Sequence, residues 1–386
     1  MRVALITDGI WPYVLGGMQK HSFYLCKYFA QNRVEVELFH FNQSNYDISK
    51  LEFFSEEELK YIRATVIDFP KSIAFPGHYL YNSYKYSKLI YGVIKNQLQR
   101  YDFIYTKGFA GWYLIEQRFK LKLTCASIGL KFHGYEMFQK APDFKTKMQH
   151  LFLLRRPARA LSKKADVVFS YGGKITDIIS SIGVDTQKIF EMPSGVEKST
   201  LASTIQNSSN TRRFLFLGRY ERRKGIEELN EAIRLILMEN GLKNYEFQFI
   251  GPIPIEKRLK LKQVIYHGEI RSKELLQQLM RKCDVLICPS WSEGMPNVIL
   301  EAMANGLAVI ATDVGATNVL VSEKTGWLIK SGDPSEITKA IQLAAALNAS
   351  ELDLKKVNAL NLLREQFNWE RLAAKLIAFI QSLPKK

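Results

Sequence analysis

Residues 291–306 read WSEGMPNVILEAMANG and follow a short apolar run at residues 284–288. Such a run is typical of a buried strand, and Pro296 stands where proline is favoured, in the first turn of a helix. A strand that leads directly into a helix is the repeating unit of parallel α/β sheets. This stretch therefore predicts a doubly wound α/β domain around it.

The same alternation of apolar runs and amphipathic segments continues in both directions along the chain. The predicted strands are residues 3–7, 34–40, 102–107, 124–132 and 166–170 in the first half and residues 214–217, 246–250, 264–267, 284–288 and 308–311 in the second. A polar segment rich in Ser, Thr and Asn, residues 198–211, is typical of a linker. We therefore expect two Rossmann-like domains, residues 1–197 and 212–365, that face each other across a central cleft.

The 386-residue chain carries a large positive charge, because 54 Lys and Arg stand against 38 Asp and Glu, a net charge of +16. Such a surplus favours an anionic partner: nucleic acid, an acidic membrane surface or a phosphate-bearing small molecule. No nucleic-acid-binding module with interleaved aromatic residues accompanies it, so nucleic-acid binding is a remote alternative. The four cysteines form no C-x-x-C pair and predict buried thiols in a reducing compartment. No window reaches the ~18 apolar residues of a membrane span, so we expect a cytoplasmic protein.

Two carboxylates in the 291–306 stretch are candidate ligand-binding residues. Glu293 precedes the predicted helix and Glu301 lies on it, with seven residues between them. Carboxylates accept two hydrogen bonds at once, which suits sugar and ribose hydroxyls, and the unpaired N–H groups of a helix N-terminus attract an anion. The alternative is that Glu293 belongs to the helix cap and that Glu301 is solvated. The spacing alone leaves both interpretations open.

Three further segments place candidate residues at the ends of predicted strands. Arg219 and Lys224 lie at a strand-to-helix turn, where a guanidinium and an ammonium group can hold a pyrophosphate. Arg222 and Arg223 of the same turn are expected to be surface charges. Gly16 and Gly17 follow the first strand and let the backbone approach a bulky anion. His133 ends a predicted strand of the first half. A solvated basic turn, an ordinary glycine turn and a structural histidine are the respective alternatives.

The segment from Glu293 to Glu301 resembles the E-x7-E signature of retaining glycosyltransferases of family 4, which have the GT-B fold of two Rossmann-like domains. The likeness is strong over residues 213–345 and weak in the N-terminal half. Similar flanking residues are AMANG at 302–306, AVIATDVG at 308–315 and GWLI at 326–329. One departure is Ala316, where a second glycine is common, and it puts the local turn in doubt.

The resemblance implies a role for each candidate residue. In the family the first Glu holds hydroxyls of the donor sugar, the backbone amides after it hold further hydroxyls, and the second Glu holds the nucleotide ribose. The strand-end histidine contacts the donor sugar near the reacting carbon. The implied catalytic residues are His133, Glu293, Arg219 and Lys224. The implied donor-binding residues are Gly16, Gly17, Arg219, Lys224, Gly268, Ile270, Glu293, Gly294, Met295, Pro296, Asn297, Val298 and Glu301.

The resemblance also implies a reaction. A sugar would move from a nucleotide-diphosphate sugar to a hydroxyl of a glycan or lipid-linked acceptor, with retention of anomeric configuration, as in a hexosyltransferase of bacterial surface polysaccharide or lipopolysaccharide synthesis. No D-x-D motif occurs in the sequence, so we expect no metal and no other cofactor. The N-terminal domain would bind the acceptor, and a helix at residues 369–383 would pack back on it. A nucleotide-sugar 2-epimerase or a phosphorylase on the same fold stays open as an alternative.

Residues 142–164 predict a basic amphipathic helix, in which Asp143 is the single acid. Its cations are Lys145, Lys147, Arg155, Arg156, Arg159, Lys163 and Lys164, and its apolar face would be Phe144, Met148, Leu151 and Phe152. Such a helix binds anionic lipid surfaces, and five tyrosines in residues 79–91 also favour the headgroup region. We therefore expect peripheral binding to the inner face of the cytoplasmic membrane. The alternative is a core-packed helix with a solvated basic side, and Pro157 is expected to interrupt it.

Overall fold

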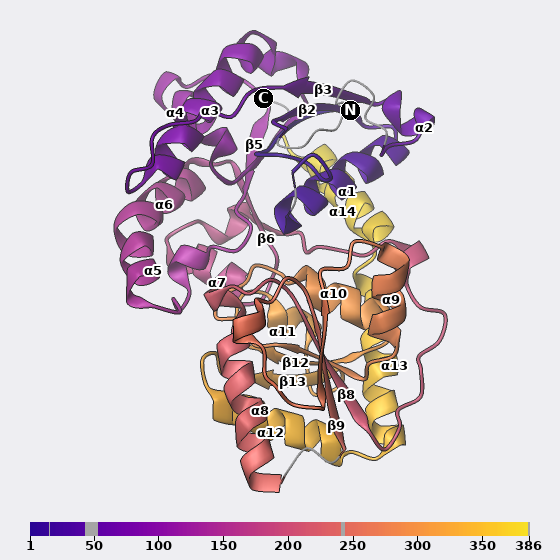
Figure 1. The fold of residues 1–386 in the computed structure, drawn as a ribbon. Coiled ribbons are helices and arrows are strands. Elements are labelled where there is room, and N and C mark those ends of the chain that lie inside the picture. Colours follow the sequence, from indigo (N-terminus) through magenta and orange to yellow (C-terminus); the bar gives the residue numbers. More distant parts are fainter. Residues whose placement is uncertain (15, 43–52, 241–243, 385–386) are drawn as a thin grey trace. The chain divides into compact units, whose positions relative to one another are not determined.

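The structure is a computed structural model that describes residues 1–14, 16–42, 53–240 and 244–384. The chain divides into two compact units, which are described separately (Figure 1). The first unit contains Met1–Phe138, Met148–Ser194 and Trp369–Lys386, and the second contains Gln139–Lys147 and Gly195–Asn368.

A seven-stranded parallel sheet forms the centre of the first unit, in the order β3-β2-β1-β4-β5-β6-β7. Its strands are β1 (Arg2–Ile6), β2 (Glu35–His40), β3 (Ile62–Val66), β4 (Phe103–Lys107), β5 (Ser127–Lys131), β6 (Val167–Ser170) and β7 (Ile189–Glu191). Every residue of β4 and β5 is buried, as expected for a parallel sheet covered by helices on both faces. The edge strands β3 and β7 are absent from the predicted set because their residues are only partly buried and form no continuous apolar run.

Helices flank this sheet and include the last helix of the chain. They are α1 (Gly17–Gln31), α2 (Glu56–Leu59), α3 (His78–Ile94), α4 (Trp112–Leu121), α6 (Arg155–Lys164), α7 (Lys174–Ser181) and α14 (Trp369–Ser382). Trp369 of α14 stacks on Tyr24 and Tyr28 of α1, with ring centroids 5.5 and 6.1 Å apart. The C-terminal helix is therefore part of the core of the first unit (Figure 1).

A six-stranded parallel sheet forms the centre of the second unit, in the order β10-β9-β8-β11-β12-β13. Its strands are β8 (Arg212–Leu217), β9 (Tyr245–Ile250), β10 (Val264–Gly268), β11 (Val285–Cys288), β12 (Ala308–Thr312) and β13 (Gly326–Ile329). Its helices are α8 (Ile226–Asn240), α9 (Lys273–Arg281), α10 (Asn297–Ala304), α11 (Thr317–Leu320), α12 (Pro334–Ala346) and α13 (Ala349–Gln366). Each unit is thus a doubly wound α/β layer structure of the predicted Rossmann-like kind.

In both sheets the strand order reverses beside the first strand of the unit. The neighbours of β1 are β2 and β4, and the neighbours of β8 are β9 and β11. Doubly wound sheets bind ligands at the carboxyl ends of the two strands that flank such a reversal. The loops after β1 and β4 in the first unit, and after β8 and β11 in the second, are therefore the places for a ligand site.

Residues 144–164 form three consecutive helical segments: α5 (Phe144–Gln149), a π-helical turn (His150–Leu154) and α6. The regular α-helix is interrupted near Pro157, as expected: a π-helical turn separates α5 from α6, and Pro157 has no N–H group to donate to the carbonyl of residue 153 in that turn. The core-packed alternative is wrong for the first two segments, in which no residue is buried. Phe144 is 75% exposed and Phe152 is 70% exposed. Within the described residues, no helix is long and apolar enough to cross a membrane.

Candidate functional site

The loops after β8 and β11 of the second unit bring a buried acid together with two cations. Glu293 follows β11, and its side chain is hydrogen bonded by Lys224 Nζ, which is 2.6 Å from Oε1, and by Ser290 Oγ, which is 2.8 Å from the same oxygen. Arg223 Nη1 lies 3.4 Å from the other carboxylate oxygen, Oε2. Both oxygens of this carboxylate are therefore engaged by groups from two different loops.

Glu293 is held in its ionised form although it is only 6% exposed. Burial acts to raise its pKa, but the nearby Lys224 and Arg223 and the hydrogen bonds from Lys224 and Ser290 together hold the pKa below its ordinary value. A buried ionised carboxylate can accept strong hydrogen bonds from a ligand's hydroxyl groups. The arrangement is suited to orienting a polyhydroxylated ligand.

The basic turn after β8 differs in part from the sequence expectation. Lys224 lies in the site, whereas Arg219 is 72% exposed in its side chain and pairs with Glu221, 2.9 Å away. Arg223 was expected at the surface with Arg222, and this is wrong for Arg223, which also donates to Ser292 O at 3.3 Å. The 3₁₀ turn Arg222–Lys224 directs Arg223 and Lys224 toward the β11 loop. The three successive basic residues of this turn were the sequence signal that could have indicated the position of Arg223 near Glu293.

Two glycines let neighbouring loops approach the Glu293 loop closely. Gly225 has a φ of +68°, and a Cβ there would lie 1.9 Å from Pro289 O. Gly315 has a φ of +57°, and its Cβ would lie 2.2 Å from Glu293 O. The departure at Ala316 leaves the turn intact, because this residue has an ordinary negative φ and its N–H donates to Gly294 O at 2.7 Å.

The remaining predicted donor-binding residues of the second unit lie around the start of α10 and at the end of β10. Met295 is buried, Pro296 is the N-cap of α10, and Asn297, Val298 and Glu301 lie half-buried on that helix. The first turn of α10 has no acidic residue, so its positive end is available to an anion. Gly268 ends β10 with a φ of +72° and open space at its Cβ position, and Ile270 follows it. These two residues lie two strands away from β8, at the same edge of the sheet.

At the strand ends of the first unit, Gly16 and Gly17 begin α1 without a side-chain cap or an acid in the first turn. Behind this turn lies Lys107, the last residue of β4, which is buried and which sequence analysis missed. Its Nζ donates to Met18 O at 3.0 Å and to Ser22 Oγ at 2.8 Å. Lys107 therefore fixes the first turn of α1, and with it the position of the glycine pair.

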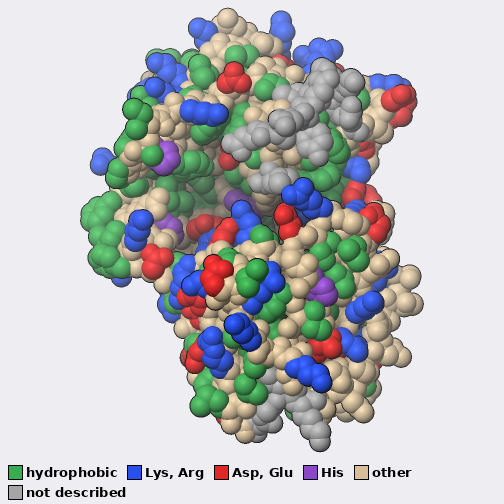
Figure 2. All heavy atoms as spheres, in the orientation of Figure 1, with side chains coloured by type: hydrophobic (Ala, Val, Ile, Leu, Met, Phe, Trp, Pro, Cys, Tyr) green, Lys and Arg blue, Asp and Glu red, His purple; other side chains and the backbone are tan. Residues whose placement is uncertain are grey.

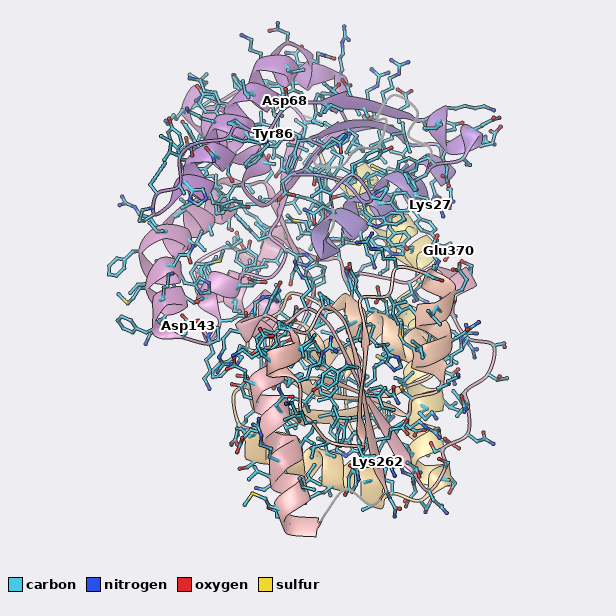
Figure 3. The ribbon with its side chains drawn as sticks, viewed as in Figure 1. Lys27, Asp68, Tyr86, Asp143, Lys262 and Glu370 are labelled. Atoms are coloured by element: carbon cyan, nitrogen blue, oxygen red, sulfur yellow. The ribbon has the colours of Figure 1, made fainter. Side chains whose placement is uncertain are left out.

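Burial shifts the charged groups behind the first turn of α1 toward neutrality. It lowers the pKa of Lys107 to about 7, although Asp8 opposes the shift, and it raises the pKa of Asp8 to about 6. His21 lies 3.0 Å from Lys107 Nζ through its Nδ1 and packs against Trp369, 5.2 Å between ring centroids. Burial also places the pKa of His21 well below its ordinary value. These contacts indicate a structural role for His21. Tyr86, labelled in Figure 3, is buried, and its hydroxyl donates to Thr7 O, directly after β1, at 3.1 Å.

His133 follows β5 and is half-buried. Its Nδ1 lies 3.0 Å from the hydroxyl of Tyr171. The register of β4 and β5 pairs Lys107 with Lys131, which is also buried and whose Nζ lies 3.7 Å from the centroid of the Tyr171 ring. Tyr171 therefore connects the histidine to the buried Lys131 at the end of β5.

The structure thus brings Lys224, Glu293 and the start of α10 together in the second unit, and Gly16, Gly17 and His133 to the strand ends of the first. Among the residues that the structure describes, no group of three or more His, Cys, Asp or Glu could hold a metal ion. The expectation of no metal stays a prediction.

The second unit matches a known family of enzymes. Residues 211–346 match the family described as "Glycosyl transferases group 1". The chain is 29% identical over 188 residues to the putative teichuronic acid biosynthesis glycosyltransferase TuaC of Bacillus subtilis. This aligned region covers 46% of each chain. It is 27% identical over 210 residues to the UDP-Gal:alpha-D-GlcNAc-diphosphoundecaprenol alpha-1,3-galactosyltransferase of Escherichia coli. This aligned region covers 49% of this chain and 53% of that one. The chain spans about half the length of the curated relatives it matches.

Solved structures resemble the whole chain. A sucrose-phosphate synthase from Thermosynechococcus elongatus superposes with a TM-score of 0.78 at 19% identity, over 98% of both chains. The lipopolysaccharide outer core galactosyltransferase WaaB in its apo form superposes with a TM-score of 0.70 at 17% identity, over 99% of this chain and all of that one. At such identities the likeness concerns the fold alone, and it confirms the predicted GT-B fold class.

Proposed function

We propose that this chain, whose residues 211–346 form a group 1 glycosyltransferase domain, transfers a sugar from a nucleotide-diphosphate sugar to a hydroxyl of a glycan or lipid-linked acceptor. The observation that carries the proposal is the buried, ionised Glu293, held by Lys224, Arg223 and Ser290 at the carboxyl end of β11. A carboxylate fixed in this way presents a rigid acceptor to sugar hydroxyls, and its cations offer charge to a phosphate.

In this proposal each part of the site binds one part of the donor. The Glu293 carboxylate and the backbone N–H groups from Gly294 to Val298 bind the sugar, and Glu301 binds the ribose. Arg219 and Lys224 bind the diphosphate, with the uncapped end of α10 adding its dipole. Gly268 and Ile270 border the base. Gly16 and Gly17 at the uncapped start of α1 lie against the phosphates and the acceptor.

The reaction would proceed with retention and without a metal. The bond between the anomeric carbon and the phosphate oxygen breaks, and the acceptor oxygen forms its bond on the same face of the sugar. The leaving diphosphate takes the acceptor's proton, while Arg219 and Lys224 neutralise its growing charge. We assign His133 to the donor sugar near the reacting carbon, since its imidazole is held by Tyr171.

We further propose a lipid-linked acceptor and a peripheral position on an anionic membrane, at the inner face of the cytoplasmic membrane. The E. coli relative is named for a diphosphoundecaprenol acceptor, and WaaB for the lipopolysaccharide outer core. Exposed cations on α6 accompany the exposed Phe152; they are Arg156, Arg159 and Lys163. Arg155 is less suited to lipid contact, because its Nε donates to Met137 O at 2.7 Å. Figure 2 shows Lys and Arg side chains interspersed with hydrophobic ones on the surface of the first unit.

A donor panel tests the proposed activity. Purified protein is incubated with UDP-glucose, UDP-galactose, GDP-mannose and ADP-glucose, and released nucleotide is measured. Arg219→Ala should lower kcat/KM for the accepted donor by about tenfold to a hundredfold, the effect of losing a charged hydrogen bond. The matched control is Arg234→Ala, which removes another exposed arginine, paired with Glu231 on α8. Absence of nucleotide release and of binding across the panel would reject the proposal.

Co-sedimentation tests the membrane position. Vesicles with and without anionic lipid are compared at low and moderate salt, with wild type and with a variant in which Arg156, Arg159 and Lys163 become Glu. Binding should require anionic lipid, decrease as salt screens the charges, and be lost in the variant. If wild type ignores anionic vesicles at low salt, a soluble acceptor becomes the better proposal.

A further inference from the structure

The segment Gln139–Lys147 packs within the second unit, although the residues on both sides of it in sequence belong to the first. Lys140 Nζ donates to Ser331 O at 3.0 Å and lies 4.7 Å from the centroid of the Trp291 ring. Asp143, labelled in Figure 3, accepts from Thr146 and is attracted electrostatically by Arg222. This segment is therefore anchored to the loops that surround Glu293.

The strongest of these contacts is made by the side-chain amide of Gln139. Its Nε2 donates to Glu293 O at 2.6 Å, and its Oε1 accepts from Glu293 N at 3.3 Å. One side chain thus binds both backbone polar groups of Glu293, as a neighbouring strand would. None of these contacts uses the Glu293 carboxylate, which remains with Lys224 and Ser290.

The carbonyl that Gln139 holds belongs to the same planar peptide group as the N–H of Gly294. In a trans peptide the C=O and N–H point in opposite directions, so fixing one fixes the other. The next carbonyl, that of Gly294, accepts from Ala316 N at 2.7 Å. The backbone is therefore restrained on both sides of the Gly294 N–H, once by Gln139 and once by the loop after β12.

We propose that Gln139 is a positioning residue of the donor site: by holding the Glu293 carbonyl it directs the Gly294 N–H at a hydroxyl of the donor sugar. This inference rests on the proposed function, in which that N–H binds the sugar and no part of the nucleotide. It follows that loss of Gln139 weakens binding of the nucleotide sugar and leaves binding of the free nucleoside diphosphate unchanged. A residue needed only for folding would affect both ligands.

Calorimetry tests this with UDP-glucose and UDP, or with the donor that the panel identifies and its nucleoside diphosphate. Gln139→Ala should weaken the Kd for the nucleotide sugar by about tenfold, as expected when the Gly294 N–H loses its hydrogen bond to the sugar, with an unchanged Kd for the diphosphate. Gln139→Glu keeps the acceptor oxygen but lacks the N–H that binds the Glu293 carbonyl, so it should show at least the same loss.

The matched control is Gln149→Ala, which removes the side-chain amide of an exposed glutamine at the end of α5 and should leave binding of both ligands as in the wild type. Kinetics give a second reading, because Gln139→Ala should lower kcat/KM for the donor and leave the KM for the acceptor unchanged. Equal weakening of both ligands, or no weakening of either, would overturn the inference. Failure of the wild-type chain to bind any nucleotide sugar would instead reject the proposed function, and the inference with it.

Discussion

Replacing Lys224 by methionine should destabilise the second unit, because it leaves Glu293 buried without its closest cation. The Nζ of Lys224 is 2.6 Å from the carboxylate, whose side chain is 8% exposed. Removing one partner of a buried ion pair costs about 3–5 kcal/mol. Arg223 at 3.4 Å and the Ser290 hydroxyl at 2.8 Å stay in place. We therefore expect a cost at the lower end, about 3 kcal/mol at neutral pH.

The cost should depend on pH in a defined direction. In the wild type the folded pKa of Glu293 lies below its unfolded value, so this group adds stability above the unfolded pKa and loses it as the pH falls through the folded pKa. In Lys224→Met, the effect of burial on the pKa of Glu293 is no longer outweighed by the charge and hydrogen bond of Lys224, so this pKa should rise. The variant then takes up a proton on folding, and its deficit in unfolding free energy should shrink between about pH 7 and pH 4.

Urea unfolding at several pH values, followed by circular dichroism, measures these differences. In a Glu293→Gln background the Lys224→Met change should cost less than about 1 kcal/mol, since no charge is then stranded. Lys262→Met is the control, because Lys262 is exposed at the amino end of β10 (Figure 3) and should shift stability by less than about 0.5 kcal/mol. An equal cost with Glu and with Gln at position 293 would refute the reasoning.

Three further changes probe the site. Glu301→Ala should raise the donor KM with little change in kcat, because a ribose contact is the same in the ground and transition states; a fall in kcat alone in steady-state kinetics would contradict this. His133→Ala should mainly lower kcat, and a shift in melting temperature with normal kcat would instead make this histidine structural. Gly315→Ala should cost at least about 2 kcal/mol in urea unfolding, because the new Cβ would meet Glu293 O in a left-handed backbone conformation. Gly92→Ala, whose Cβ would meet nothing within 4 Å, should be neutral or stabilising.

The sequence alone predicted much of each domain because the signals involved are local. The apolar run that becomes β11 and the proline at the start of α10 lie in adjacent windows, and the predicted strand-to-helix order holds in both units. Glu293 and Lys224 stood out by their place after predicted strands. Edge strands such as β3 and β7 were missed because a partly buried strand has no continuous apolar run.

Only the tertiary structure decided which of these groups meet. Lys224 and Glu293 are 69 residues apart, and Gln139 and Glu293 are 154 apart. They come together because β8 and β11 are neighbours in the sheet and because Gln139–Lys147 packs with the second unit. Strand order and register follow from the burial of whole sheets, so no single window contains them. For that reason Arg223 was expected at the surface, and the buried Lys107 went unnoticed, until the fold placed each beside its partners.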